Sequence, residues 1–261
     1  MKAFTSFVAC ASMLVALSAA HAGVVVEEHE SVTRGGKSSQ QTRTIIVQDY
    51  KQKMTTPSEQ VITDLDRHLL IVIHPTQRTY LSMPFPPPMN PPGAMGPAAL
   101  FELVFHRSGT SRTVSGYRCQ EYKASGRAAS GDYTVAGCFS TEAPGASDFD
   151  AFDQKMWTEL KGSRLSVAGD FPHGVPLELD STTRINIASI PGLTPQQAEA
   201  LHKLVGADSL LETRTRVVKI SRRSLPPDTF VVPVGYTPQS AWPAPGAARP
   251  PLPPPGTKLP E

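Results

Sequence analysis

The stretch that decides the fold runs from Val61 to Pro84 and has the sequence V-I-T-D-L-D-R-H-L-L-I-V-I-H-P-T-Q-R-T-Y-L-S-M-P. It predicts three short strands joined by two tight turns, because the residues at 64–66 and 74–76 are of types that favour turns. Leu69 to Ile73 is an unbroken apolar run rich in β-branched residues, which is typical of a strand buried on both faces. Such a strand needs packing partners on each side, and the rest of the chain has to supply them.

The first residues have the pattern of a secretory signal peptide. Lys2 supplies a positive charge, residues 7–17 are mostly apolar, and Ala20-His21-Ala22 is a small-x-small cleavage site. We therefore expect residues 1–22 to be removed and the mature chain to begin at Gly23 in the periplasm. A lipoprotein signal that ends at Cys10 is the alternative, but the apolar run before Cys10 is shorter than an h-region.

The composition excludes two classes of partner. The 261 residues include 25 basic and 23 acidic ones, which is not the basic excess of a surface that binds nucleic acid. After the signal peptide, no segment approaches the roughly 20 apolar residues that a membrane-spanning helix needs. We therefore expect a mature protein that is soluble or peripheral to the membrane.

Two cysteines remain once Cys10 is removed with the signal peptide. An even number of cysteines in an exported protein predicts a disulfide, here between Cys119 and Cys138. A metal pair or a reactive thiol is the alternative, but no His or second Cys stands beside either one at ligand spacing. Residues 113–123 and 132–140 predict the two strands of a hairpin around this bridge.

The disulfide suggests a register for that hairpin. If Cys119 lies opposite Cys138, Tyr122 lies opposite Val135, and apolar residues meet across one face. The turn is then centred between Ala128 and Ala129.

Three segments predict helices, at residues 98–105, 147–160 and 194–205. The first would place Leu100, Leu103 and Val104 on one face. The second has Ser147 as its candidate cap and one apolar stripe, formed by Phe149, Phe152, Met156 and Leu160. The third starts at Thr194-Pro195-Gln196-Gln197, which is typical of a helix N-terminus.

Further strands are predicted at 24–27, 41–47, 50–54, 175–179, 182–190 and 210–220. The last of these carries a basic run that begins at Arg214 and Arg216 and continues to Arg223. A solvated edge strand is the simpler interpretation, because Lys and Arg protect sheet edges from aggregation. A contact with anionic lipid headgroups is the functional alternative.

Two segments are rich in proline. Pro84 to Pro97 holds seven prolines, and Pro238 to Glu261 holds nine. Proline cannot donate to a strand ladder, so the first segment predicts a loop and the second a disordered tail. Either segment could instead be a docking ligand for other envelope proteins.

Four segments in this order resemble one bacterial family: 64–83, Gly116-Tyr117-x-Cys119-x-x-Tyr122, 174–177 and Phe230-Val231-Val232-Pro233-Val234-Gly235-Tyr236. The family is the bacterial envelope family catalogued as domain of unknown function 4412, and the resemblance spans most of residues 24–236. The family is thought to be related to the LolA/LppX-like fold. The resemblance implies an α+β domain at 23–237, in which a curved antiparallel sheet (a half-barrel) packs against two or three helices. It also implies an apolar cavity for acyl chains or lipoproteins.

No known catalytic pattern is present in the chain. It has no G-x-S-x-G, no H-E-x-x-H and no paired His at helical spacing, and the family supplies no catalytic residues. We therefore expect a protein that is not an enzyme and has no metal or cofactor. The function predicted is a carrier or scaffold with an apolar groove for a lipid or lipoprotein acyl chain, lined by Leu69, Ile71, Ile73, Phe149, Phe152 and Met156. The alternative is a structural or interaction protein that acts through its proline-rich segments.

Overall fold

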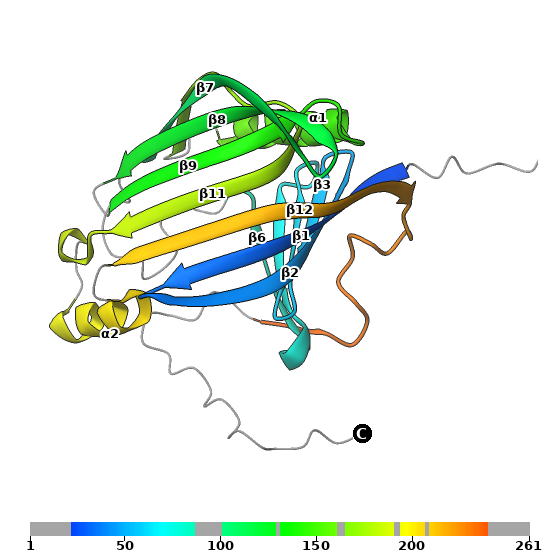
Figure 1. Ribbon diagram of the computed structural model, residues 1–261. Coiled ribbons are helices and arrows are strands. Elements are labelled where there is room, and N and C mark those ends of the chain that lie inside the picture. Colours follow the sequence, from blue (N-terminus) through cyan, green and yellow to red (C-terminus); the bar gives the residue numbers. More distant parts are fainter. Residues whose placement is uncertain are drawn as a thin grey trace, which may run out of the picture.

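The computed structural model, drawn in Figure 1, describes residues 22–86, 101–128, 131–160, 165–190, 194–206 and 209–239. Almost all of the predicted signal peptide, most of the predicted proline-rich loop and residues 240–261 of the predicted tail lie outside the described residues. Within the described ranges, no helix has the length and apolar character to span a bilayer.

Thirteen strands of the described residues form one sheet, in the spatial order β10-β7-β8-β9-β11-β12-β1-β2-β3-β4-β5-β6-β13. Neighbouring strands are antiparallel except at the two edges, where β10 runs parallel to β7 and β13 runs parallel to β6. The strands are β1 (Ala22–Arg34), β2 (Lys37–Gln48), β3 (Lys51–Thr55), β4 (Gln60–Asp64), β5 (Leu69–His74), β6 (Thr79–Pro84), β7 (Phe101–Val114), β8 (Tyr117–Ala128), β9 (Gly131–Ser140), β10 (Leu165–Gly169), β11 (Val175–Ile185), β12 (Leu210–Ser224) and β13 (Thr237–Pro238).

Two-residue turns join some of the long neighbouring strands. Gly35 and Gly36 between β1 and β2 have φ angles of 54° and 73°, and Ser115 and Gly116 between β7 and β8 have 50° and 86°. Positive φ at both central residues matches the right-handed twist of the flanking strands, so such hairpins favour it.

The described residues contain two α-helices, α1 (Ala146–Leu160) and α2 (Pro195–Val205), and two 3-10 turns, η1 (Pro75–Gln77) and η2 (Ile187–Ser189). Helix α1 packs against β2, β10 and β11, whereas the main contact of α2 is with η2. Figure 1 places α2 at the end of the long strands.

The predicted start of α2 is confirmed, and the predicted cap of α1 is wrong. The Thr194 hydroxyl accepts a hydrogen bond from the Gln197 N–H, and the Gln197 side chain accepts one from the Thr194 N–H. Helix α1 begins at Ala146, so Ser147 lies inside it.

The predicted fold class, an antiparallel half-barrel packed on two or three helices, is wrong. The sheet is mixed and has thirteen strands, and of the two α-helices described α1 is the one that packs mainly on it. Residues 101–105, predicted as helix, begin β7 instead, with Leu103 and Phe105 buried on one side and Val104 half-buried on the other. The segments 175–179 and 182–185 are one strand, β11, and β10 was not predicted.

The sheet bends between its long and its short strands. In Figure 1 the long strands from β7 to β2 slope across the view, whereas β3 to β6 run nearly upright beside them. The largest apolar cluster lies on the side that carries α1 and joins Phe149 and Phe152 to residues of both parts, including Val24, Val47 and Leu65.

Residues 61–84 form three strands as predicted, namely β4, β5 and β6. The expected burial of β5 on both faces is wrong, because Ile71 and Ile73 are buried while Leu70 and Val72 are only half-buried. The turn before β5 is more deeply buried, since Leu65 has no exposed surface.

The basic run lies on β12, a central strand between β11 and β1, so the edge-strand interpretation is wrong. Several of its charges are paired with neighbouring elements. Arg214 Nε lies 2.6 Å from Asp180 Oδ1 on β11, and Arg222 contacts Asp148 at the start of α1. These residues therefore help to tie the middle of the sheet to its neighbours.

The predicted disulfide is confirmed, but the predicted register is not. Cys119 and Cys138 are bonded with their Cα atoms 5.4 Å apart. Strands β8 and β9 pair so that Tyr122 lies opposite Gly137 rather than Val135. The centre of the hairpin lies one residue later than predicted, so each residue of β8 pairs with a residue two positions further along β9. Cys119 and Cys138 are therefore diagonal neighbours rather than a directly opposite pair.

Candidate binding face

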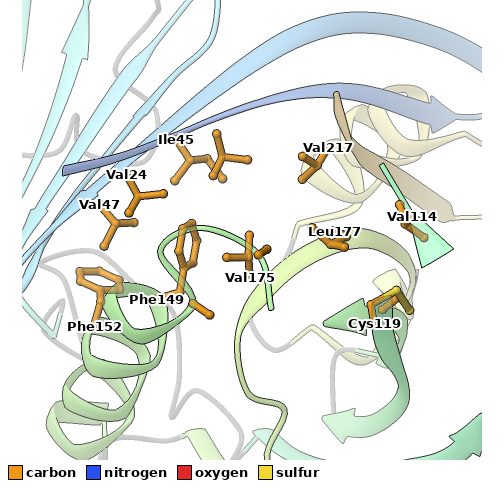
Figure 2. Packing of buried hydrophobic residues seen from close by; sticks show 14 of the residues in the cluster. Val24, Ile45, Val47, Val114, Cys119, Phe149, Phe152, Val175, Leu177 and Val217 are labelled. Carbon is orange, nitrogen blue, oxygen red and sulfur yellow. A yellow bond between two sulfur atoms is a disulfide. The ribbon is translucent and has the colours of Figure 1, made fainter. Parts of the chain in front are cut away.

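The three predicted groove residues of α1 lie in the protein core. Figure 2 shows Phe149 and Phe152 pointing from α1 toward Val24 and Val47 of β1 and β2. Phe149 is 3% exposed and Phe152 is 1% exposed, and Met156 packs partly buried against the same cluster. All three therefore have partners within the protein.

The three predicted groove residues of β5 lie in a different cluster. Ile71 and Ile73 are buried with Ile62, and Leu69 packs partly buried beside them. The segment that follows β12 covers this cluster with Phe230, Val232 and Tyr236. The structure does not bring the two predicted sets together, and their role in ligand binding stays a prediction.

A third apolar cluster lies on β7, β8 and β9. Its buried members are Leu103, Phe105 and Ala124, and its partly buried members are Tyr133, Val135, Val167 and Phe171. The Phe171 ring centroid lies 5.8 Å from that of Phe105 and 5.6 Å from that of Trp157 on α1. We call these residues, with Trp157, the aromatic cluster. It lies on the side of the sheet that carries α1.

Strand pairing continues this cluster across the sheet, because residues directly opposite each other share a face. One row of cross-strand neighbours is Ala124, Val135, Ser181, Thr213 and Val32. The next row is Tyr122, Gly137, Leu179, Thr215, Glu30 and Gln41. In the second row the side chains change from apolar on β8 and β11, through the hydroxyl group of Thr215 on β12, to a charged and an amide group on β1 and β2. The first row passes through Ser181 and Thr213 and ends at the apolar Val32. We call these two rows and the aromatic cluster the graded face.

The polar end of the graded face is a network of buried charges. Glu28 is 1% exposed, and its Oε2 accepts hydrogen bonds from Nε and Nη2 of Arg43 at 2.9 and 2.6 Å. Arg43 Nη1 donates to Glu30 at 3.1 Å, and the Gln41 amide donates to the same carboxylate at 2.5 Å. Burial raises the pKa of Glu28, against the lowering effect of Arg43. When both carboxylates are ionised, the single guanidinium group of Arg43 leaves this end of the face with a net negative charge.

A carboxyl group with a raised pKa stands beside the aromatic cluster. Burial, helped by the charge of Asp150, raises the pKa of Asp153 to about 7. Asp150 accepts a hydrogen bond from the Gly174 N–H at 2.6 Å and lies 3.5 Å from Nδ1 of His173. Asp153 lies one helical turn before Trp157, so the two share a side of α1. A protonated carboxyl group is less costly than a charged one beside apolar side chains.

Sequence reasoning missed most of this face. Assigning 98–105 to a helix hid Leu103 and Phe105, and no element was predicted around Phe171. The charged end did leave a signal, because alternate residues of a strand share a face. Glu28 and Glu30 follow Val24 and Val26 at that spacing, which places two carboxylates on the apolar face. In the described parts of the chain, no three His, Cys, Asp or Glu residues gather as metal ligands.

No family model and no curated protein matches this chain. Among solved structures, PNGF-II is similar at a TM-score of 0.39 and 10% identity over 84% of this chain and 31% of that one, so this chain spans about a third of its length. A LolA superfamily protein from Nitrosomonas europaea has a TM-score of 0.29 and 6% identity, over 80% of this chain and 90% of that one. A protein of the domain of unknown function 1329 family from Desulfovibrio piger has a TM-score of 0.31 and 7% identity, over 80% and 89% of the two chains. At these TM-scores the likeness carries no argument, and membership of the 4412 family stays a prediction.

Proposed function

We propose that this chain is a non-enzymatic carrier or scaffold of the periplasm that binds the acyl chain of a lipid or lipoprotein on the graded face. The observation that carries this proposal is the order of side chains along the row from Tyr122 to Gln41, which begins with apolar side chains and ends with a charged and an amide group. An amphiphile has the same order, with an apolar chain at one end and a polar headgroup at the other.

The apolar end offers surface for an acyl chain. Tyr133, Val135, Val167 and Phe171 pack on the buried part of the aromatic cluster but stay partly exposed. Removing apolar surface from water is favourable by about 25 cal/mol per Å². A chain lying on these side chains therefore gains binding free energy that the protein's own folding has not used.

The polar end favours one kind of headgroup. Glu28 and Glu30 share Arg43 as their cation, so an ammonium group near them meets a negative field. The hydroxyl group of the half-buried Thr213 lies between the two ends and can hydrogen-bond to an ester or amide oxygen.

The compartment is proposed from two features. The first 22 residues have the signal-peptide pattern, and the Cys119–Cys138 disulfide suits an oxidising compartment. The mature chain would then begin at Gly23, directly before the buried run Val24-Val25-Val26 of β1.

Native mass spectrometry of the mildly extracted periplasmic protein tests the proposal. The expected result is a fraction of molecules that carry one amphiphile, and tandem dissociation of the adduct distinguishes a phospholipid from an acylated peptide. A ligand-free protein that instead captures envelope proteins, and loses them on truncation after Gln239, would contradict the proposal and support the interaction-protein alternative.

A further inference from the structure

A cavity of about 300 Å³ lies away from the graded face, with which it shares no residue. The β2–β3 turn, the β4–β5 turn and the segment after β12 form its walls. Its lining residues are Gln48, Asp49, Lys51, Asp64, Arg67, Leu225, Pro226, Pro227, Phe230 and Val231. This volume is at the lower end of the range for sites that bind small molecules.

Four charged side chains of both signs line this cavity without pairing with one another. Lys51 and Asp64 are directly opposite on β3 and β4, so their side chains share a face. Within the described part of the chain, no ion pair within 4 Å involves the side chains of Asp49, Lys51, Asp64 or Arg67. Opposite charges that line one cavity and stay apart are available to a ligand that carries both charges.

Of the four charged side chains, that of Asp64 has the clearest unused hydrogen-bonding capacity. It is only 5% exposed, and the partner of its carboxylate among the described residues is the Arg67 N–H, 3.1 Å from Oδ1. A carboxylate has about four acceptor positions, and a buried one normally fills more of them. The side chain thus has acceptor capacity left for a donor that enters the cavity.

The opposite wall is apolar and held in shape by local hydrogen bonds. Phe230 and Leu225 are half-buried there, and the chain between them forms turns. The Thr229 N–H donates to the Pro226 carbonyl at 3.1 Å, and the Val231 N–H donates to the Asp228 carbonyl at 3.1 Å. This wall suits the apolar body of a ligand whose charged groups point toward the strand turns.

We propose that this cavity binds a small zwitterion, with its ammonium group at Asp64 and Asp49 and its acidic group at Lys51 and Arg67. Two kinds of molecule have this chemistry and size. One is a free α-amino acid with an apolar side chain, and the other is the phosphoethanolamine headgroup of a lipid.

Isothermal titration of the mature full-length protein tests the site with four compounds. L-leucine and glycerophosphoethanolamine carry both charges, whereas N-acetyl-leucine and leucinamide each lack one. We expect one of the two zwitterions to bind, and its identity shows whether the ligand is a free amino acid or a lipid headgroup. If leucine binds, both single-charge leucine analogues should bind at least about tenfold more weakly than leucine. Binding of neither zwitterion, or equal binding of leucine and both analogues, would overturn the proposal.

Variants locate the site. Lys51→Gln and Asp49→Asn should each weaken binding of the zwitterion by about tenfold, since each removes one charge contact. Lys37→Gln is the matched control, because Lys37 is an exposed lysine at the far end of β2, and its affinity should equal that of the parent. Asp49 is exposed and Lys51 is half-buried, so melting temperatures should stay within a few degrees. An unchanged affinity in both variants would place the binding elsewhere and refute the assignment.

Discussion

Lys155 of α1 donates a hydrogen bond to Asp66 in the turn between β4 and β5, with 2.5 Å between Nζ and Oδ1. The same ammonium group lies 4.1 Å from the centre of the Tyr50 ring. Beside Asp66, Leu65 is fully buried in the cluster that contains Phe149. The stretch from Val61 to Pro84 is therefore joined to α1 by its first turn.

This turn should depend on its buried leucine far more than on its ion pair. Leu65→Ala removes a fully buried side chain and should lower the free energy of unfolding by about 2–4 kcal/mol. Asp66→Asn breaks an ion pair whose side chains are 27% and 50% exposed and therefore screened by water, so it should lower this free energy much less. Urea denaturation at pH 7 measures both, and the reverse order would show that the ion pair holds α1 in place.

The charged end of the graded face should be sensitive to loss of its cation. Arg43→Met leaves Glu28 and Glu30 buried without their guanidinium and should destabilise the protein by about 3 kcal/mol or more. Arg127→Met is the matched control, because the Arg127–Asp132 pair is 86% and 54% exposed, and it should change stability by less than about 0.5 kcal/mol. Equal losses of stability in the two variants would show that the buried network stabilises the protein no more than an exposed ion pair does.

Asp153 should make stability depend on pH. Its ordinary pKa is 3.8 and its pKa in the folded protein is about 7, so between these values the folded state binds the proton and the unfolded state does not. The stability linked to this proton is fully present below pH 3.8 and is lost as pH rises through about 7.

Asp153→Asn mimics the protonated form at every pH. Relative to the parent, the variant should therefore gain stability as pH rises from 5 to 8, by about 1–3 kcal/mol at the upper end. Thermal unfolding of both proteins across this range measures the difference. A difference that stays constant with pH would show that Asp153 titrates near its ordinary value.

The disulfide should stabilise the fold without being required for it. Cys119 and Cys138 are 19 residues apart in sequence, and closing a loop of this length stabilises a protein by about 3 kcal/mol in the chain-entropy model. Reduction, or the double substitution Cys119→Ala and Cys138→Ala, should lower the melting temperature of the protein but leave its strand content intact by circular dichroism. Loss of all strand signal on reduction, or no change in melting temperature, would contradict this role.

Local sequence signals predicted the elements whose residues depend on near neighbours. The turns around Asp64 and Pro75, the capping box at Thr194 and the apolar stripe of α1 all appear in the structure. Strand β7 was missed because Leu103, Val104 and Phe105 are consecutive apolar residues, which fit both helical and strand spacing. The parallel pairing of β10 with β7 joins residues more than 60 positions apart, and no local pattern specifies it.

The candidate site was harder to predict than the fold. Periodicity identified Phe149 and Phe152 as apolar face residues, and they are, but it does not distinguish a side chain that packs in the core from one that lines a groove. The graded face depends on the register of seven neighbouring strands from β7 to β2. The one-residue error in the β8–β9 hairpin was enough to misplace Val135 relative to its true neighbour, Ala124.

The measurement that tests the acyl-chain proposal most directly compares valine substitutions inside and outside the aromatic cluster. Val135 belongs to this cluster, whereas Val218 lies at the register shift between β12 and β1, belongs to none of the three apolar clusters and is 46% exposed. A fluorescent long-chain fatty acid is titrated into the parent protein and into the variants Val135→Asn and Val218→Asn, and its affinity for each is measured. We predict that Val135→Asn weakens binding by at least about fivefold, through lost apolar contact and an added polar group, while Val218→Asn binds like the parent. Equal affinity of all three proteins, or no binding by the parent, would contradict the proposal.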